Sequence, residues 1–172
     1  MHNVAELLRL IHNLIRTGTI AEVDHDAARV RVKSGELLTD WLLWIEGRAG
    51  TTRDWDPPTV GEQVIVFSPG GDPAAGVVLT GLYRSAHPAP SSDANVIGRW
   101  YPDGTRIEYD HAKHRLFIDC VGDIAVKATG TVTVDAKSIH HNQGNPVVTT
   151  GHICHFTGNP HGDGSSTVTA GK

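Results

Sequence analysis

An eight-residue repeat runs through residues 115–138, which read RLFIDCVGDIAVKATGTVTVDAKS. Apolar and polar residues alternate within each unit and a small residue closes it, which is typical of short strands that end in turns. The apolar residues form three columns with a spacing of eight: Leu116, Ile124 and Val132; Ile118, Val126 and Val134; Cys120, Ala128 and Ala136. The residues that close the units are Gly122, Gly130 and Ser138. The repeat therefore predicts three strands, each with one apolar and one polar face.

Three strands of this kind cannot bury their apolar face alone, because a sheet needs a second layer and no other segment supplies one. A solenoid within one chain is an alternative, but three turns without capping repeats would be marginally stable. It is more economical for identical chains to wrap round one axis and share an apolar interior. We therefore expect residues 96–148 to form an intertwined, trimeric, triple-stranded β-helix.

The N-terminal segment predicts a short amphipathic helix. Residues 3–18 read NVAELLRLIHNLIRTG, in which the apolar residues share one face at helical spacing. Asn3 and Glu6 have the spacing of a capping box, and Gly18 follows the last expected turn. The apolar stripe of this helix must pack on its own domain or on a partner.

From residue 19 to residue 84 the hydrophobic period changes to two, and five short strands are expected. The first two form a hairpin round a turn at Asp24–Ala28. Five antiparallel strands in so short a segment suit a Greek-key barrel of the OB type. The predicted domains are the helix (1–18), the OB barrel (19–84), a proline- and serine-rich linker (85–95), the β-helix (96–148) and an apex (149–172).

Charge and aromatic placement argue against a nucleic-acid partner. The formal net charge is −4, and acidic residues offset the arginines throughout the barrel segment. An OB domain that binds single strands needs a basic groove with exposed aromatic rings. Trp41 and Trp44 flank Leu42 and Leu43, a pattern that indicates packing in the barrel rather than stacking on bases. We expect no nucleic-acid binding.

The two cysteines, Cys120 and Cys154, are too few for a disulfide framework and are expected to be free thiols. No run of residues is long and apolar enough to span a bilayer. Glu6 and Arg9 interrupt the only apolar stretch that resembles a signal peptide. We expect the protein to be made in the cytoplasm, with no export signal of its own.

The segment TTGHICHFTGNPHGDG, residues 149–164, predicts a metal site. It has no apolar run to build a core, yet three histidines and a cysteine lie within ten positions. Imidazole and thiolate both bind zinc and iron. The candidate ligands are His152, Cys154, His155 and His161. On an extended strand His152 and Cys154 face one side and His155 the other, so the exact ligand set stays open.

A metal is expected at this point because a tapering tip has too little apolar area to hold three chains together. A structural metal contributes about 10–16 kcal/mol in small sites. His140 follows Val132 by eight positions and would form a second axial ring if the repeat continued. We favour the alternative, in which the repeat has ended before His140. His111 and His114 lie in a polar turn and are expected to be exposed.

We expect no enzymatic activity. Cys154 beside His155 suggests a nucleophile, but short repeats offer no concave site that excludes water. PGGDPAAG, residues 69–76, is a turn and not a phosphate-binding loop. Two other function classes stay open on these grounds: a soluble metal-binding domain, and an OB-type binding module with a histidine-rich tail.

Two blocks of sequence together are specific for a known family. The first is residues 15–83, which begin IRTGTIAEVDHD and end AAGVVLTGLY, and the second is RWYPDGTRIEYD, residues 99–110. With the glycine- and histidine-rich terminus, they resemble the baseplate assembly protein V, or central spike, of contractile-tailed phages and R-type bacteriocins. Spikes of type VI secretion systems share this architecture.

The resemblance implies an all-β homotrimer with an N-terminal helix, an OB-like barrel, a β-helix and a pointed apex. Such a spike nucleates the baseplate hub, contacts hub and tail-tube proteins, and pierces the host outer membrane when the sheath contracts. It belongs to the tail baseplate of a virion or bacteriocin, and a separate protein caps the tip in some members.

The resemblance also bears on the metal. In several members a His-x-His motif places six imidazoles round one iron ion on the threefold axis. That precedent favours one iron, rather than one zinc, per trimer. This chain departs from the motif, because it has His152-Ile153-Cys154-His155 in its place.

Overall fold

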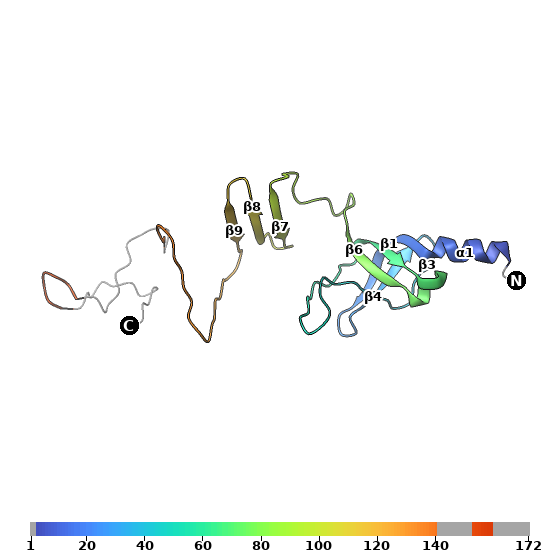
Figure 1. The fold of residues 1–172 in the computed structure, drawn as a ribbon, viewed down its shortest axis with the longest axis horizontal. Helices are drawn as coiled ribbons and strands as arrows, with labels where there is room; N and C mark the ends of the chain where they lie inside the picture. The colour runs from blue at the N-terminus through green and yellow to red at the C-terminus, as the bar shows by residue number, and fades with distance from the viewer. Residues whose placement is uncertain (1–2, 141–152, 160–172) are drawn as a thin grey trace. The chain divides into compact units, whose positions relative to one another are not determined.

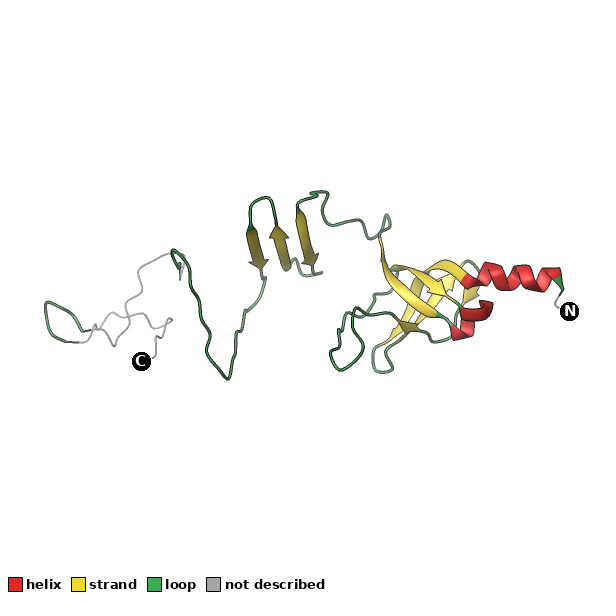
Figure 2. Cartoon of the chain, in the orientation of Figure 1, coloured by secondary structure: helices red, strands yellow, loops and turns green. Residues whose placement is uncertain are grey.

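The computed structural model describes residues 3–140 and 153–159. The chain divides into two compact units, residues 1–121 and 122–172, and every assigned helix and strand belongs to the first (Figures 1 and 2). None of the helices in the described ranges is both long enough and apolar enough to span a membrane. The elements are α1 (Val4–Leu14), β1 (Ile15–Asp24), β2 (Arg29–Ser34), β3 (Leu37–Leu38), β4 (Leu43–Trp44), β5 (Gln63–Phe67), η1 (Pro69–Gly71), η2 (Pro73–Ala75), β6 (Val77–Leu82), β7 (Val96–Trp100), β8 (Arg106–Asp110) and β9 (Arg115–Asp119).

Strands β1 to β6 form a curled sheet in the order β3-β2-β1-β5-β6-β4. Neighbouring strands are antiparallel except β4, which runs parallel to β6. Val30 and Leu42 exchange two backbone hydrogen bonds, of 2.9 and 2.8 Å, which join β2 to the chain that enters β4. The sheet therefore closes on itself, as predicted for a Greek-key barrel. The predicted set of five antiparallel strands is wrong, because the sheet has six strands and β4 pairs with β6 in parallel.

The barrel is filled by branched aliphatic side chains from alternate strand positions. Buried and less buried residues alternate along β2 and β5, which is the period of two expected from the sequence. Trp44 packs against this core, as predicted, whereas Trp41 lies half-buried with the Arg31 guanidinium 5.8 Å from its ring centroid. The core residues are Ile20, Val30, Val32, Leu42, Val64, Val66 and Val78.

Helix α1 begins as the sequence predicts but ends earlier. The Asn3 side chain caps it by accepting a hydrogen bond from the Ala5 N–H (3.3 Å). The helix ends at Leu14, and Ile15 is already extended, with φ −138°, as the first residue of β1. The prediction that the helix ends at Gly18 is therefore wrong.

Gly18 lies inside β1 and is needed there for a different reason. A Cβ at this position would lie 2.5 Å from Val32 Cγ1 and 2.7 Å from the carbonyl oxygen of Lys33. Both atoms belong to β2, which pairs with β1. Glycine thus permits the close approach of two barrel strands and does not cap a helix.

The polar edge of α1 contacts the barrel. Asn13 is buried, and its Oδ1 accepts a hydrogen bond of 3.0 Å from Arg16 Nη1. Arg16 Nε donates to Ser34 Oγ in β2 (3.1 Å). Gly71, with φ +76°, comes so close to the Leu10 backbone that a side chain would not fit. This polar anchorage fixes the helix while its apolar stripe stays uncovered in the single chain.

Strands β7, β8 and β9 form a three-stranded antiparallel meander. A turn at Pro102-Asp103-Gly104 joins β7 to β8, and Gly104 has φ +93°. The Asp103 carboxylate accepts hydrogen bonds from the backbone N–H of Thr105 (2.9 Å) and from its hydroxyl (3.0 Å). The turn residues thus behave as the sequence indicates.

The second turn of the meander is organised by Asp110, the buried last residue of β8. Its Oδ1 accepts from the backbone N–H groups of Ala112 (3.1 Å) and Lys113 (3.0 Å), and its Oδ2 from Lys113 Nζ (2.6 Å). The side-chain hydrogen bond from Lys113, aided by the two backbone donors, lowers the pKa of Asp110 below its ordinary value. The same contact raises the pKa of Lys113.

Asp110 should therefore make the meander sensitive to acid. A carboxyl group whose pKa is lower in the folded than in the unfolded state stabilises the folded state. Its contribution is complete at any pH above the unfolded-state pKa of about 3.9. That contribution disappears as the pH falls through the folded-state value. We expect the thermal midpoint, followed by circular dichroism, to fall more steeply between about pH 5 and pH 2 in the parent than in Asp110→Asn. Parallel curves for the two proteins would contradict this assignment.

In the second unit, the described residues 122–140 are extended and form no assigned strand. The backbone bends at Val121–Gly122, at Thr129–Gly130 and at Lys137, and runs straight over 123–128 and 131–136. These bends recur with the eight-residue spacing of the sequence repeat. The periodicity is therefore present in the backbone, while the β-helix that we expect from it stays a prediction.

Candidate assembly surface and tip

One face of the meander is apolar and uncovered. The strand register places Ile97 opposite Tyr109 and Tyr109 opposite Leu116, and places Ile107 opposite Ile118 in the next row. These five side chains, which we call the meander face, therefore point to the same side of the sheet. Arg99 lies on the same side, opposite Ile107, and its guanidinium pairs with Asp56. All are exposed in the single chain, from 40% for Ile107 to 71% for Ile97.

The opposite face of the meander is covered by its own side chains. Phe117 lies between two guanidinium groups, with Arg115 Cζ 4.4 Å and Arg106 Cζ 5.2 Å from its ring centroid. Arg106 Nε also lies 3.5 Å from Asp119 Oδ2. One side of the sheet thus suits contact with water, and the meander face has apolar groups without a covering layer.

The nine predicted interior residues fall into two groups. Leu116 and Ile118 lie on the meander face, and Cys120 is half-buried just after β9. The other six lie on the extended segment of the second unit, where all are exposed in the single chain. They are Ile124, Val126, Ala128, Val132, Val134 and Ala136.

Sequence reasoning missed three members of the meander face: Ile97, Ile107 and Tyr109. The signal was present as alternation in VIGRW (96–100) and RIEYD (106–110). Each run is only five residues long, and a turn separates them. The hydrophobic period alone is weak evidence in so short a run.

Helix α1 presents a second uncovered apolar surface. Its outward stripe is exposed, from 41% for Leu14 to 71% for Val4. Sequence reasoning identified this stripe but not the polar edge with Asn13 that contacts the barrel. The stripe consists of Val4, Leu7, Leu8, Ile11 and Leu14, and Ile15, the first residue of β1, is also exposed.

Of the four candidate tip ligands, the structure describes Cys154 and His155. They lie in a turn closed by hydrogen bonds from Cys154 N to Asn159 O (2.8 Å) and from Gly158 N to Cys154 O (2.9 Å). The His155 ring contacts the Phe156 ring edge-on, with centroids 5.6 Å apart. His152 and His161 lie outside the described residues. The metal site therefore stays a prediction.

The remaining histidines are placed more simply. His140 is exposed, with Nε2 3.4 Å from Ser138 Oγ. His111 and His114 are exposed in the turn between β8 and β9, which confirms the prediction for them. Within the described ranges, no group of three or more His, Cys, Asp or Glu side chains has the arrangement of a metal site.

The barrel and its sequence match the same kind of domain. Residues 16–83 match the family model of the type VI secretion system/phage-baseplate injector OB domain, and this segment runs from β1 to just past β6. The closed strand order and this match together define an injector-type OB domain, which confirms the predicted barrel.

A second similarity extends beyond the barrel. The chain is 42% identical to the spike protein of Escherichia phage P2 over 131 residues, which are 76% of this chain and 62% of that protein. The chain is therefore similar to a phage baseplate spike over three quarters of its length, and residues 16–83 carry the phage-baseplate type of OB domain. Both comparisons are with structural components of injection machines, and the absence of catalysis in this chain stays a prediction.

Proposed function

We propose that this protein is the homotrimeric central spike of a contractile-tail baseplate. In this proposal the OB barrels join the hub and nucleate its assembly. Residues 96–148 of three chains intertwine into a β-helix, and residues 149–172 form the apex that pierces the host outer membrane on sheath contraction. The spike is then part of a virion or bacteriocin tail, and its partners are hub and tail-tube proteins.

The observation that carries the proposal is the uncovered meander face. A three-stranded sheet with one face open to water lacks the second layer that a stable domain needs. Burial of a large apolar side chain contributes roughly 1.5–3 kcal/mol, and each chain offers five on this face. The exposed apolar columns from Ile124 to Ala136 also need a covering layer. Two further copies of the same surface would satisfy it.

The apex is proposed to hold one metal ion per trimer, iron before zinc. Support comes from the donor chemistry of the segment, in which Cys154 and His155 lie on a compact turn and His152 and His161 flank it. A bound ion would hold three chain ends together where apolar area runs out. A separate capping protein is compatible with this arrangement.

Helix α1 is proposed to bind a hub protein. Its Asn13 and Arg16 hydrogen bonds hold it on the barrel, so its apolar stripe points away from the chain's own core. A fixed helix with an exposed stripe suits the groove of a partner.

The proposal is tested by the mass of the purified protein in dilute solution. We expect light scattering to give three times the 18.5 kDa chain mass, without dissociation at low micromolar concentration. An intertwined trimer should also migrate as a trimer in SDS unless it is boiled, because its strands cannot leave singly.

The two alternatives predict different results. A soluble metal-binding domain would be a compact monomer with bound metal. An OB module with a flexible tail would be a monomer that loses residues 96–172 to protease. A monomer of either kind contradicts the spike proposal. The similarity to a phage baseplate spike favours neither alternative.

A further inference from the structure

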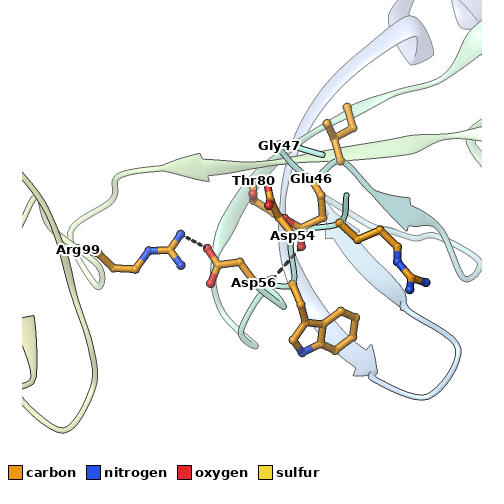
Figure 3. A pocket seen from close by; sticks show the side chains of 9 residues that line it. Glu46, Gly47, Asp54, Asp56, Thr80 and Arg99 are labelled. Carbon is orange, nitrogen blue, oxygen red and sulfur yellow. Dashed lines mark hydrogen bonds and ion pairs between the residues drawn. The ribbon is translucent and has the colours of Figure 1, made fainter. Parts of the chain in front are cut away.

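A polar hollow of about 670 Å³ lies at the long connection between β4 and β5 (Figure 3). Its wall includes the carboxylates of Glu46, Asp54 and Asp56 and the Thr80 hydroxyl of β6. Trp55 also contributes to the wall and is 59% exposed. Guanidinium groups come from Arg53 and Arg99, both within the first unit. Apart from Arg99, which lies on the same side of the sheet as the meander face, these residues are not part of the surfaces proposed for assembly or metal binding.

Local hydrogen bonds hold the Glu46 carboxylate and the loop backbone that carries Asp54 and Asp56. Glu46 Oε1 accepts from Trp44 Nε1 (2.8 Å) and from the backbone N–H of Asp56 (3.0 Å). The backbone N–H of Asp54 donates to the Arg48 carbonyl oxygen (2.9 Å). Glu46 thus links the loop backbone at Asp56 to Trp44, which packs against the barrel core. The walls are therefore largely pre-formed, as in most small-ligand sites.

Gly47 leaves room for the Asp54 carboxylate in the wall of the hollow. A Cβ at this position would lie 2.7 Å from Asp54 Oδ2, so the Asp54 carboxylate occupies the space that a side chain would fill. Figure 3 shows Asp54 and Asp56 beside Glu46, with Arg99 reaching Asp56. That ion pair measures 2.7 Å between Arg99 Nη2 and Asp56 Oδ2.

The lining combines acceptors, donors and an aromatic ring. Carboxylates only accept hydrogen bonds and guanidinium groups only donate them, whereas a hydroxyl does both. A ligand rich in hydroxyl groups therefore matches both kinds of wall. The Trp55 ring, tilted against Trp44 with centroids 5.6 Å apart, offers an apolar surface beside them.

We propose that this hollow binds a saccharide. Hydroxyl groups would pair with Asp54, Glu46 and the guanidinium groups, and the Trp55 ring would pack against the apolar side of a sugar ring. OB barrels bind oligosaccharides as well as nucleic acids through their loops. A basic peptide fits less well, because Arg53 and Arg99 offset two of the three carboxylates and leave the lining little net negative charge. The inference goes beyond the spike role and needs neither the trimer nor the tip metal.

Isothermal titration of the full-length protein tests the site, with maltoheptaose, chitopentaose and delipidated lipopolysaccharide core oligosaccharide as probes. We expect saturable binding of at least one probe. Trp55→Ala should weaken that binding by roughly tenfold or more. Asp54→Asn keeps the shape of the side chain and should also weaken it. Tyr83→Ala, which removes an exposed aromatic ring outside the hollow, should bind as the parent does.

Each other outcome overturns the proposal. Absence of binding by all three probes up to about 10 mM would do so, since 1 mM already corresponds to weak binding. Binding of an arginine- and lysine-rich peptide instead would mark a protein-docking site. Equal weakening by Tyr83→Ala would show contact outside the hollow. Circular dichroism and light scattering of each variant confirm that fold and assembly are intact. The spike proposal is judged by mass alone, so the two failures are distinguishable.

Discussion

Ile118→Asp is expected to convert the trimer into single chains. Ile118 is 50% exposed in one chain and lies on the meander face opposite Ile107. If three copies bury this face together, the variant places three carboxylates in a mainly apolar interior. Arg99 lies in the same row of the sheet, but its guanidinium already pairs with Asp56. Each unpaired buried charge costs several kcal/mol, which gives on the order of 10 kcal/mol per trimer. Light scattering at micromolar concentration should then give the mass of one chain.

The repeat provides a matched pair for the same test. Val126→Asp adds a carboxylate to an apolar column, and Ala125→Asp adds one at the neighbouring position, which alternation places on the polar face. We expect the first variant to dissociate and the second to remain trimeric. The OB barrel should stay folded in both, since its core is separate from these residues. A trimeric Val126→Asp would show that the columns do not form the interior.

The sequence predicts those parts of the fold that depend on regular period. Alternation identifies β2 and β5, whose buried residues fill the barrel core, and helical spacing identifies α1. The eight-residue spacing is recovered as bends at Val121–Gly122 and Thr129–Gly130. In each case the element must place apolar residues on one surface at a regular spacing. That spacing is visible in the sequence, so the element can be predicted from it.

The features that were missed depend on contacts between distant residues. Gly18 has the position expected after a helix, but its role depends on Val32 and Lys33 in another strand. Trp41 resembles Trp44 in sequence, and only the fold places it beside Arg31 instead of against the core.

The polar hollow is another feature that the sequence does not reveal, because the composition of residues 45–56 indicates only an irregular loop. Glu46 and Asp56 are brought together by one side-chain-to-backbone hydrogen bond between residues ten positions apart. Periodicity carries no information about such a bond, so this site could be found only from the structure.

Loss of the apical metal is the other large effect we expect. His152→Ala should reduce the metal content, measured by elemental mass spectrometry, from one ion per trimer to nearly none. His111→Ala is the matched control, because His111 is an exposed histidine in the β8–β9 turn and should leave the metal content unchanged. Apparent metal binding energies of about 10–16 kcal/mol in small sites indicate how much stability the apex stands to lose.

That loss should be confined to one end of the protein. The barrel core is formed by residues between Ile20 and Val78, and none of them precedes or follows the candidate ligands closely in the chain. Chelation at neutral pH is therefore expected to expose residues 149–172 to protease while the barrel stays folded and the trimer stays intact. An anomalous X-ray scan on crystals of the parent would identify the ion and locate it on or off the threefold axis. Unchanged metal content in His152→Ala would remove that residue from the site, and a metal-free parent would remove the site itself.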